Sequence, residues 1–458
     1  MCTRVSSLVA RVAAVLGLVA AGLIASGCRE APPRHSALVI TLDTTRADAL
    51  SSLGGRAGTT PHLDALAERG TLFSEARSET NVTGPSHVTI LSGLRAIDHG
   101  VHWNGAPIPE QVETLPVALQ REGWSTGGFV ASRHLSAEMG WRGFDSLPVV
   151  ENQLTAREVT DRALEWLAGE AGEPFFLWVH YWDPHMQYSP PPELAAEFYT
   201  RDPTAGTGPR LADHPYFTLF PRVGVAEWLG EVRDPEWAKA MYAAELHSAD
   251  AEIGRLLAAA EEAARGGLVV AVTADHGESL GEHGIFYGHR GLYEPQLRVP
   301  LIVSVPGGPV QRASELVSTL DVAPTVAELL GVELGSPVSG TSLAQRVREG
   351  SEVAGLADRV HVYENARNQG VAVRTGDWKL IVGIERSHPL YSGPPQLYDL
   401  GRDPGETVDR AAEEPERVAE MMARLEPWLE LGVIQRGTMP HLDDAAVERL
   451  RALGYLED

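Results

Sequence analysis

Three short fragments of the sequence hold side chains that could do chemistry together. Two of them place an aspartate directly after an apolar run, at Asp43 and at Asp275, which His276 follows. The other sets Thr83 at the start of an apolar stretch with helical character. Two carboxylates and an imidazole can bind a divalent cation and ionise a hydroxyl, and a helix N-terminus favours the anion that results. The fragments therefore hold the residue types of metal-assisted nucleophilic chemistry.

A plainer interpretation exists for each of these residues. Aspartates at strand ends most often serve in turns or caps, and a threonine at a helix start is a common cap. Arg46 is expected to pair with an acidic neighbour rather than to contact a substrate. The chemical interpretation therefore depends on whether the fold brings Asp43, Thr83 and Asp275 together.

Alternating apolar and amphipathic segments indicate how these residues are positioned. Buried strands are predicted at 37–42, 128–131, 175–180, 268–273 and 301–305, and helices at 61–69, 117–122, 156–168 and 238–264. This alternation predicts a doubly wound, mostly parallel α/β sheet with helices on both faces. Ligands bind beyond the carboxyl ends of such strands, where Asp43, 180–183 and Asp275 fall.

The pattern changes along the chain and suggests the following divisions. The Pro- and Gly-rich segment 190–233 has no clear period and is expected to pass over the site. We predict a catalytic α/β domain at 37–339, a small C-terminal subdomain at 340–410 and closing helices at 411–458. The subdomain is expected to be antiparallel, with strands at 371–374, 378–382 and 396–399, and the closing helices to lie at 415–431 and 443–453.

The N-terminus resembles a bacterial export signal. Arg4 and Arg11 precede the apolar run 12–25, which is short for a membrane span, and Ala25-Ser26-Gly27-Cys28 resembles a lipobox. We expect a signal peptide at 1–27, lipid on Cys28 and a tether at 29–36, which would place the protein in the bacterial cell envelope, on a periplasmic or extracellular face. The alternatives are an uncleaved anchor and an ordinary signal peptide.

Composition narrows the classes of partner. The 458 residues include 62 Asp and Glu against 38 Lys and Arg, a formal net charge of −24, which argues against nucleic acid as a partner. The only cysteines are Cys2 and Cys28, so a disulfide scaffold and a cysteine-ligated zinc site are excluded.

Long stretches of the sequence resemble the sulfatase family of the alkaline phosphatase superfamily. The matching text is LVITLDTTRAD, TPHLDALAERGTLFSEA, GPSHVTILSG, DHGV, FFLWVHYWDPH, TADHGESLGEHG, YGHRGLYEPQLRVPLIV, RTGDWKLI and LYDLGRDPGE. The resemblance implies an alkaline phosphatase-like fold and a metal-dependent hydrolase of sulfate or phosphate esters with a covalent intermediate. It assigns the metal to Asp43, Asp275 and His276, and makes Thr83 the nucleophile and a further ligand.

The sequence departs from this family at the nucleophile. Most sulfatases carry a Cys or Ser that is converted to formylglycine, and threonine cannot give that aldehyde. Thr83-Gly-Pro-Ser-His87 is closer to the Thr-x-Pro-Asn-His stretch of the superfamily's phosphodiesterases and phosphoryl transferases. Those relatives place an asparagine 21 residues after the nucleophile to stabilise the transferred group, and Asn104 stands at that distance here.

Two further departures concern the metal. Thr44 replaces a second aspartate, and His289 replaces the usual lysine, which shifts the expected cation from calcium toward manganese or zinc. Asp183, His185 and His289 could form a second metal site. Alternatively, His185 and His289 act as a general acid and a cationic anchor beside a single metal. His87 either contacts the substrate or has a structural role.

Three functions therefore follow from the resemblance. The first is a hydrolase of sulfate or phosphate esters, acting on an anionic glycan, lipid or small molecule. The second is a phosphodiesterase or a phosphoryl transferase of the phosphoethanolamine type. The third, of a different class, is an inactive homologue that binds anionic glycans.

Overall fold

An eight-stranded sheet forms the centre of the body that begins at His35. The computed structural model describes residues 34–222, 224–365, 369–384 and 388–437. The strand order is β10-β2-β8-β5-β1-β4-β3, with β9 also paired to β2. The bounds are β1 (Ser36–Leu42), β2 (Thr71–Arg77), β3 (Ser125–Val130), β4 (Phe175–Tyr181), β5 (Leu268–Ala274), β8 (Arg298–Ser304), β9 (Gln311–Ala313) and β10 (Val317–Ser318).

All strands of this sheet run in one direction except β8, which is antiparallel to both β5 and β2. The predicted mostly parallel α/β sheet is therefore confirmed. The strand expected at 301–305 is β8, and its direction has a simple cause. After β5 the chain stays at the carboxyl end of the sheet through residues 275–297, so it re-enters the sheet from that end.

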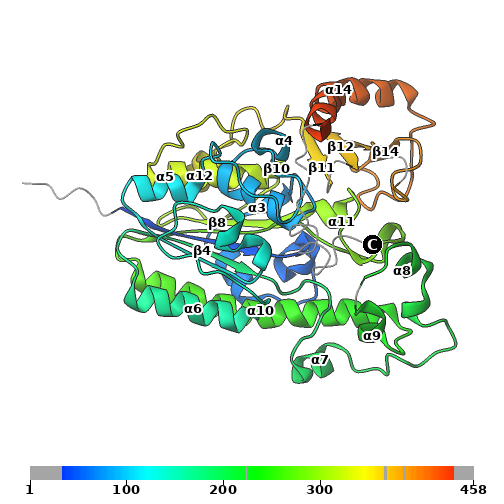
Figure 1. The fold of residues 1–458 in the computed structure, drawn as a ribbon, viewed down its shortest axis with the longest axis horizontal. Coiled ribbons are helices and arrows are strands. Elements are labelled where there is room, and N and C mark those ends of the chain that lie inside the picture. The colour runs from blue at the N-terminus through cyan, green and yellow to red at the C-terminus, as the bar shows by residue number, and fades with distance from the viewer. Residues whose placement is uncertain (1–33, 223, 366–368, 385–387, 438–458) are drawn as a thin grey trace, which may run out of the picture. The chain divides into compact units, whose positions relative to one another are not determined.

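Helices cover both faces of the sheet (Figure 1). One layer holds α2 (Pro61–Ala67), α6 (Ala156–Gly169) and α10 (Pro235–Ala263), and the other α3 (Thr83–Ser92), α5 (Leu115–Arg121) and α12 (Val322–Leu330). Every residue of β1, β4 and β5 is buried, as expected for central strands covered on both faces. Further short elements are α4 (Ala96–His99), α11 (Glu294–Leu297) and the pair β6 (Ser279–Leu280) and β7 (Phe286–Gly288).

The segment 190–233 contains three short helices rather than an irregular loop. They are α7 (Pro192–Phe198), α8 (Pro215–Leu219) and α9 (Val225–Leu229). The first two begin with proline, which is favoured in the first turn of a helix because it has no N–H to leave unpaired. Helices of five to seven residues are too short to produce a recognisable period in the sequence.

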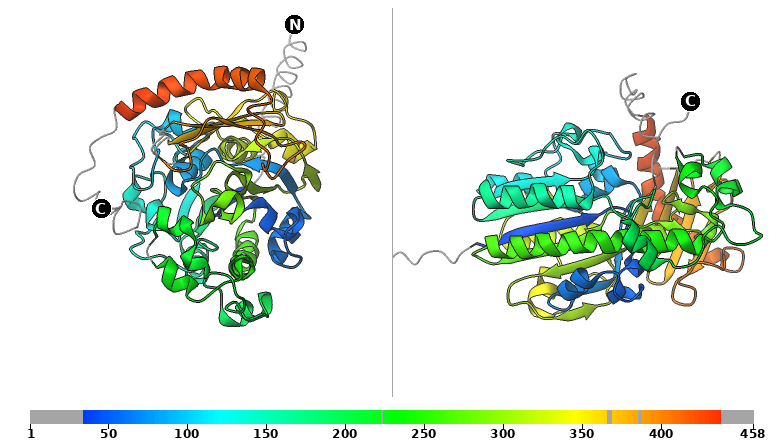
Figure 2. Two further views of the ribbon diagram at one scale, coloured as in Figure 1. Left: turned by 90° about the vertical axis from the view of Figure 1, so that its right-hand side faces the viewer. Right: turned by 90° about the horizontal axis from the view of Figure 1, so that it is seen from below.

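A four-stranded antiparallel sheet follows in the C-terminal part. It consists of β11 (His361–Glu364), β12 (Gly370–Thr375), β13 (Trp378–Gly383) and β14 (Gln396–Asp399). Helix α14 (Pro415–Gly437) packs Met421 and Leu425 across it (Figure 2). Before it, α13 (Ala344–Glu349) buries Ala344 and Val347 in the core of the main sheet.

Two predicted segments lie outside the described residues. They are the helix at 443–453 and the N-terminal 1–33, so the signal peptide, the lipid on Cys28 and the envelope localisation stay predictions from the sequence. Within the described residues no helix is both long and apolar enough to cross a bilayer.

A buried ionic cluster joins the two sheets and supports a stability prediction. Lys379 is fully buried, with Nζ 3.1 Å from Glu294 Oε1 and 2.8 Å from Glu406 Oε1. Burial alone would raise the pKa of Glu294, but Arg77, Lys379 and Arg374 hold it well below its ordinary value. Lys379→Ala is expected to lower the free energy of unfolding by about 3–5 kcal/mol, because it leaves the buried carboxylate of Glu406 without its close cation and weakens the cluster around Glu294.

The matched control is Lys239→Ala, which removes an exposed lysine paired with Glu236 and should cost less than about 1 kcal/mol. Urea unfolding at pH 7 measures both. Equal losses in the two variants would contradict the structural role of Lys379.

Candidate active site

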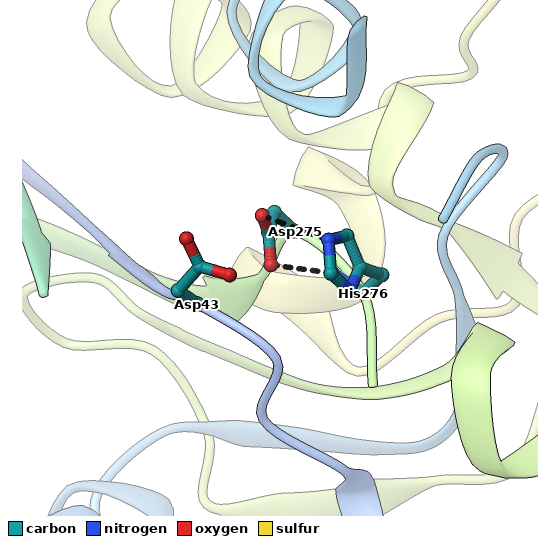
Figure 3. A group of neighbouring side chains, drawn as sticks. All are labelled: Asp43, Asp275 and His276. Atoms are coloured by element: carbon teal, nitrogen blue, oxygen red, sulfur yellow. Dashed lines mark hydrogen bonds and ion pairs between the residues drawn. The ribbon is translucent and has the colours of Figure 1, made fainter. Parts of the chain in front are cut away.

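The carboxyl ends of three neighbouring strands meet at the candidate site. Asp43 follows β1, Asp275 and His276 follow β5, and His180 lies near the end of β4. The ladder continues past the strand ends, because Asp43 N donates to Tyr181 O and Asp275 N to Leu42 O. These bonds hold the first residue of each turn, so the carboxylates of Asp43 and Asp275 lie close together (Figure 3).

Asp43, Asp275 and His276 form the only potential metal-binding group of three or more such side chains in the described part of the chain. All three are fully buried, and one ligand atom from each lies within 4.8 Å of the others. Burial raises the pKa of Asp43 well above its ordinary value, and nearby Glu278 raises it further. Burial and the charge of Asp43 do the same for Asp275.

The atoms that point into this cluster lack hydrogen-bond partners. Both carboxylate oxygens of Asp43, Oδ2 of Asp275 and Nε2 of His276 have none. The His276 Nδ1 lies 3.0 Å from Gly277 O, which fixes the proton on Nδ1 and leaves a lone pair on Nε2. Buried carboxylates without donors are costly unless a cation compensates them. The donor set therefore fits a divalent metal ion.

Thr44 fixes the orientation of Asp275. Its backbone N–H donates to Asp275 Oδ1 at 3.1 Å, and the N–H of His276 donates to the same oxygen at 2.7 Å. Oδ2 is thereby left for the site. Thr44 makes this contact with φ at 48°, a left-handed conformation that is unfavourable for a β-branched residue and costs about 1–3 kcal/mol. The residue that replaces the family's second aspartate thus contributes its backbone rather than a carboxylate.

Thr83 lies in the first turn of α3 with its hydroxyl buried and unpaired. It is close enough to Asp275 to act on the pKa of that carboxyl. His87 secures this turn, since its Nδ1 lies 2.7 Å from Thr83 O and its Nε2 3.0 Å from Thr41 Oγ1. Thr41 in turn accepts a bond from Trp178 Nε1. With both ring nitrogens occupied, His87 suits the structural role better than substrate contact.

Asn104 is held beside the nucleophile turn. Its Oδ1 accepts the Gly84 N–H at 2.7 Å, and its Nδ2 is buried without a partner. Gly84 permits this approach, because a Cβ there would lie 3.1 Å from Asn104 Oδ1. The amide therefore has two N–H donors left for an oxygen of a bound group.

His185 and His289 lie at one side of the cluster. The ring of His289 stacks on that of His276 with centroids 4.3 Å apart and lies 6.0 Å from that of His185. Their Nδ1 atoms lie 2.6 Å from Met186 O and 2.7 Å from Asn81 O, which leaves Nε2 of each as the proton acceptor.

Asp183 does not join His185 and His289 in a second three-ligand group. Its Oδ2 accepts the N–H of Ala156 at 3.0 Å, at the start of α6.

Burial lowers the pKa of both His185 and His289 well below the ordinary value of an imidazole, and Arg222 lowers it further. Neutral imidazoles favour proton acceptance over the cationic-anchor role considered above.

Two residues near the site had no role in the sequence interpretation. His180 Nε2 lies 3.5 Å from Asp43 Oδ2, and neither ring nitrogen has a hydrogen-bond partner. The sequence shows that His180 belongs to an apolar strand. It does not show that His180 pairs with Thr41, the register that directs the side chain of His180 to this face of the sheet. Arg222 belongs to the segment 190–233 and acts electrostatically on His276, His185 and His289. Arg46 pairs with Asp48 and Glu282, as expected.

Comparisons with known proteins agree with this architecture. The family model described as Sulfatase matches residues 36–332, and the model described as N-sulphoglucosamine sulphohydrolase, C-terminal, matches 281–431. The chain is 24% identical to an N-acetylglucosamine-6-O-sulfatase of Bacteroides thetaiotaomicron, with 87% of each protein covered.

Two solved structures with a similar fold come from proteins that act on different kinds of ester. The phosphonate monoester hydrolase of Agrobacterium radiobacter superposes with a TM-score of 0.68 at 23% identity, covering 88% of this chain and 96% of that one. BT4656 in complex with its substrate D-glucosamine-2-N,6-O-disulfate gives a TM-score of 0.69 at 22% identity, covering 87% and 98%. The neighbours thus include proteins named for sulfur and for phosphorus esters.

Proposed function

The chain belongs to the sulfatase family of ester hydrolases and has its alkaline phosphatase-like fold, and from this premise we propose that it cleaves sulfate or phosphate esters through a covalent intermediate on Thr83. One observation carries the proposal. The buried hydroxyl of Thr83 lies close enough to Asp275 to act on the pKa of its carboxyl, and Asp275 belongs to a buried group of unpaired ligand atoms with Asp43 and His276.

These residues would hold a divalent cation together with Thr83. The cation would lower the pKa of the hydroxyl and offset the charge of the two carboxylates. Two carboxylates with one imidazole and one hydroxyl suit manganese or zinc better than calcium, which prefers more oxygen ligands.

The remaining steps belong to the chain's own side chains. Thr83 Oγ1 forms a bond to the sulfur or phosphorus while the bond to the leaving oxygen breaks. The proton of Thr83 passes to a neutral imidazole at the rim, His185 or His289, which can return it to the leaving oxygen. The free N–H groups of Asn104 can donate to an oxygen of the transferred group. Water then attacks the ester on Thr83 and restores the hydroxyl.

A second candidate is a phosphodiesterase or phosphoryl transferase. It is favoured by the threonine nucleophile and by Asn104, whose amide is positioned by Gly84 as a donor. In a transferase, an acceptor alcohol replaces water in the second step. The intact ligand group argues against the inactive glycan-binding homologue, which has no need of it.

Metal binding tests the proposal. Asp275→Asn and His276→Ala are expected to lose bound metal and nearly all ester hydrolysis, because each removes one of the three atoms of the buried ligand group. In wild-type protein, manganese at 100 times its Kd should add about 2.7 kcal/mol to the free energy of unfolding. Neither variant should show this gain. Elemental analysis and thermal unfolding before and after chelation measure the effect.

Asp250→Asn serves as the matched control. Asp250 is a buried aspartate that accepts the backbone N–H groups of His62 and Leu63, away from the ligand group. This variant should keep its metal. Unchanged metal content in both ligand variants would exclude this site.

A further inference from the structure

Arg222 brings a positive charge to the edge of the candidate active site. Its guanidinium donates to Tyr287 O at 2.8 Å and contacts Met186 Sδ at 3.7 Å. Tyr287 directly precedes Gly288 in the sequence, and Met186 directly follows His185, which lies at the site. Among the described residues, Arg222 forms no ion pair, and its two contacts are neutral groups. Its charge is therefore not cancelled by a bonded carboxylate.

The backbone at Gly288 lies beside both Arg222 and Tyr216. A Cβ at Gly288 would lie 3.6 Å from Arg222 Nη2 and 3.0 Å from the hydroxyl of Tyr216. Both polar groups thus face the same point on the backbone, one residue before His289. His289 in turn stacks on His276. Arg222 and Tyr216 are therefore connected to the ligand group through Gly288, His289 and His276.

The hydroxyl of Tyr216 is a second, independent sign of a missing partner. Tyr216 is 4% exposed, and its Oη has no hydrogen bond. Phe220 and Ile285 pack around the ring, so the side chain is fixed while its polar end stays unpaired. A buried hydroxyl without a partner is unfavourable, and an oxygen of a ligand would remove that cost.

Electrostatics favour an anion at this point. Burial raises the pKa of Tyr216, and the positive charges of Arg222 and Arg290 oppose that rise, so both cations act on the end of the ring that carries the hydroxyl. The chain as a whole carries a net charge of −24, so a local cation is needed to hold an anionic substrate. Guanidinium groups recognise carboxylate and sulfate oxygens with directed hydrogen bonds.

We propose that Arg222 and Tyr216 form a subsite for a second anionic substituent, a carboxylate or sulfate group, on the leaving-group part of the substrate. The inference rests on the proposed ester hydrolysis and narrows its substrate class to esters with at least two acidic groups. Because α8 and Arg222 belong to the segment 190–233, this segment supplies specificity, while the strand ends supply the chemistry.

Paired substrates test the subsite. The probes are methyl 4-nitrophenyl phosphate and its 3-carboxy analogue, which differ by one carboxylate on the leaving group. In wild type the carboxylated ester should have the higher kcat/KM. Arg222→Gln should lower the ratio of the two kcat/KM values about 10- to 100-fold, Arg222→Lys less, and Tyr216→Phe a few-fold. The two esters also differ in leaving-group reactivity. This difference is the same for every variant, so it cancels when the kcat/KM ratio of a variant is compared with that of wild type.

Arg210→Gln is the control, since Arg210 lies in the same segment but pairs at the surface with Asp213 and Glu231. Its ratio should equal that of wild type. Binding is measured separately by calorimetry with both esters on Thr83→Ala, alone and combined with Arg222→Gln.

The two hypotheses fail in different ways. If wild type hydrolyses neither of these esters and no 4-nitrophenyl sulfate either, the proposed function fails, and the ratio of the two Kd values still decides the subsite. An unchanged Kd ratio and an unchanged kcat/KM ratio in Arg222→Gln would overturn the subsite.

Discussion

Thr83→Ala is expected to lower kcat/KM by about three orders of magnitude or more. The variant removes the atom that carries the covalent intermediate in the proposed mechanism, and loss of a nucleophile has an effect of this size in other enzymes. Folding should be almost unaffected, because the interaction of Oγ1 with the Asp275 carboxyl is a minor one and Oγ1 has no other partner among the described residues. Steady-state rates on nitrophenyl esters and thermal unfolding measure the two effects.

Two control variants distinguish the loss of the Thr83 hydroxyl from a general disturbance of helix α3. Thr89→Ala removes another buried threonine from α3, one whose hydroxyl pairs with His99 Nε2, and should keep most of the activity. Thr83→Ser retains a hydroxyl and should recover part of the rate lost in Thr83→Ala. More than about a tenth of wild-type activity in Thr83→Ala would show that the nucleophile is another group.

Phosphorus esters are expected to be better substrates than sulfate esters, by about 100-fold or more in kcat/KM. A phosphorylated threonine can be hydrolysed by water. A threonine sulfate lacks the geminal hydroxyl of an aldehyde hydrate, through which a formylglycine enzyme expels sulfate by elimination. The unpaired Nδ2 of Asn104 also favours phosphorus esters, because the superfamily's phosphodiesterases place an asparagine at this spacing to stabilise the transferred group.

Matched nitrophenyl esters give the measurement. Bis(4-nitrophenyl) phosphate and 4-nitrophenyl phenylphosphonate are compared with 4-nitrophenyl sulfate in protein loaded with manganese or zinc. A preference for the sulfate would refute the argument from threonine and leave a sulfatase that works without formylglycine.

The sequence was sufficient to predict the class of fold and the convergence of the metal-ligand residues. Long apolar runs that stop at Asp43 and Asp275 show buried strands and the ends at which they terminate. The direction of β8 could not be obtained in the same way, because an apolar run looks alike in both orientations. Strand β2 was missed, since its polar residues break the apolar pattern, and β11 was missed because only Val362 and Tyr363 of its four residues are apolar.

The orientation of side chains is the second property that could not be predicted from the sequence. Asp183 comes two residues after the end of β4, whereas Asp43 directly follows β1, and Asp183 accepts a backbone N–H of α6 rather than joining His185. His180 reaches Asp43 because its strand register places it beside Thr41, which no spacing in the sequence reveals. Arg222 comes from a segment without recognisable period, so only the folded chain shows that it lies near the histidines.

The position of β1 between β4 and β5 has a consequence for how the protein is made. Contacts at this centre join residues 137 positions apart, from Trp178 to Thr41, and 231 apart, from Thr44 to Asp275. Such distant segments meet late, since the entropy of closing long loops is lost before their contacts form. A growing chain that has not yet reached β5 holds Asp43 alone of the ligand group. In the proposed metal site, loading of the ion therefore belongs to the end of folding, because a truncated or misregistered chain lacks Asp275 and His276 at this place.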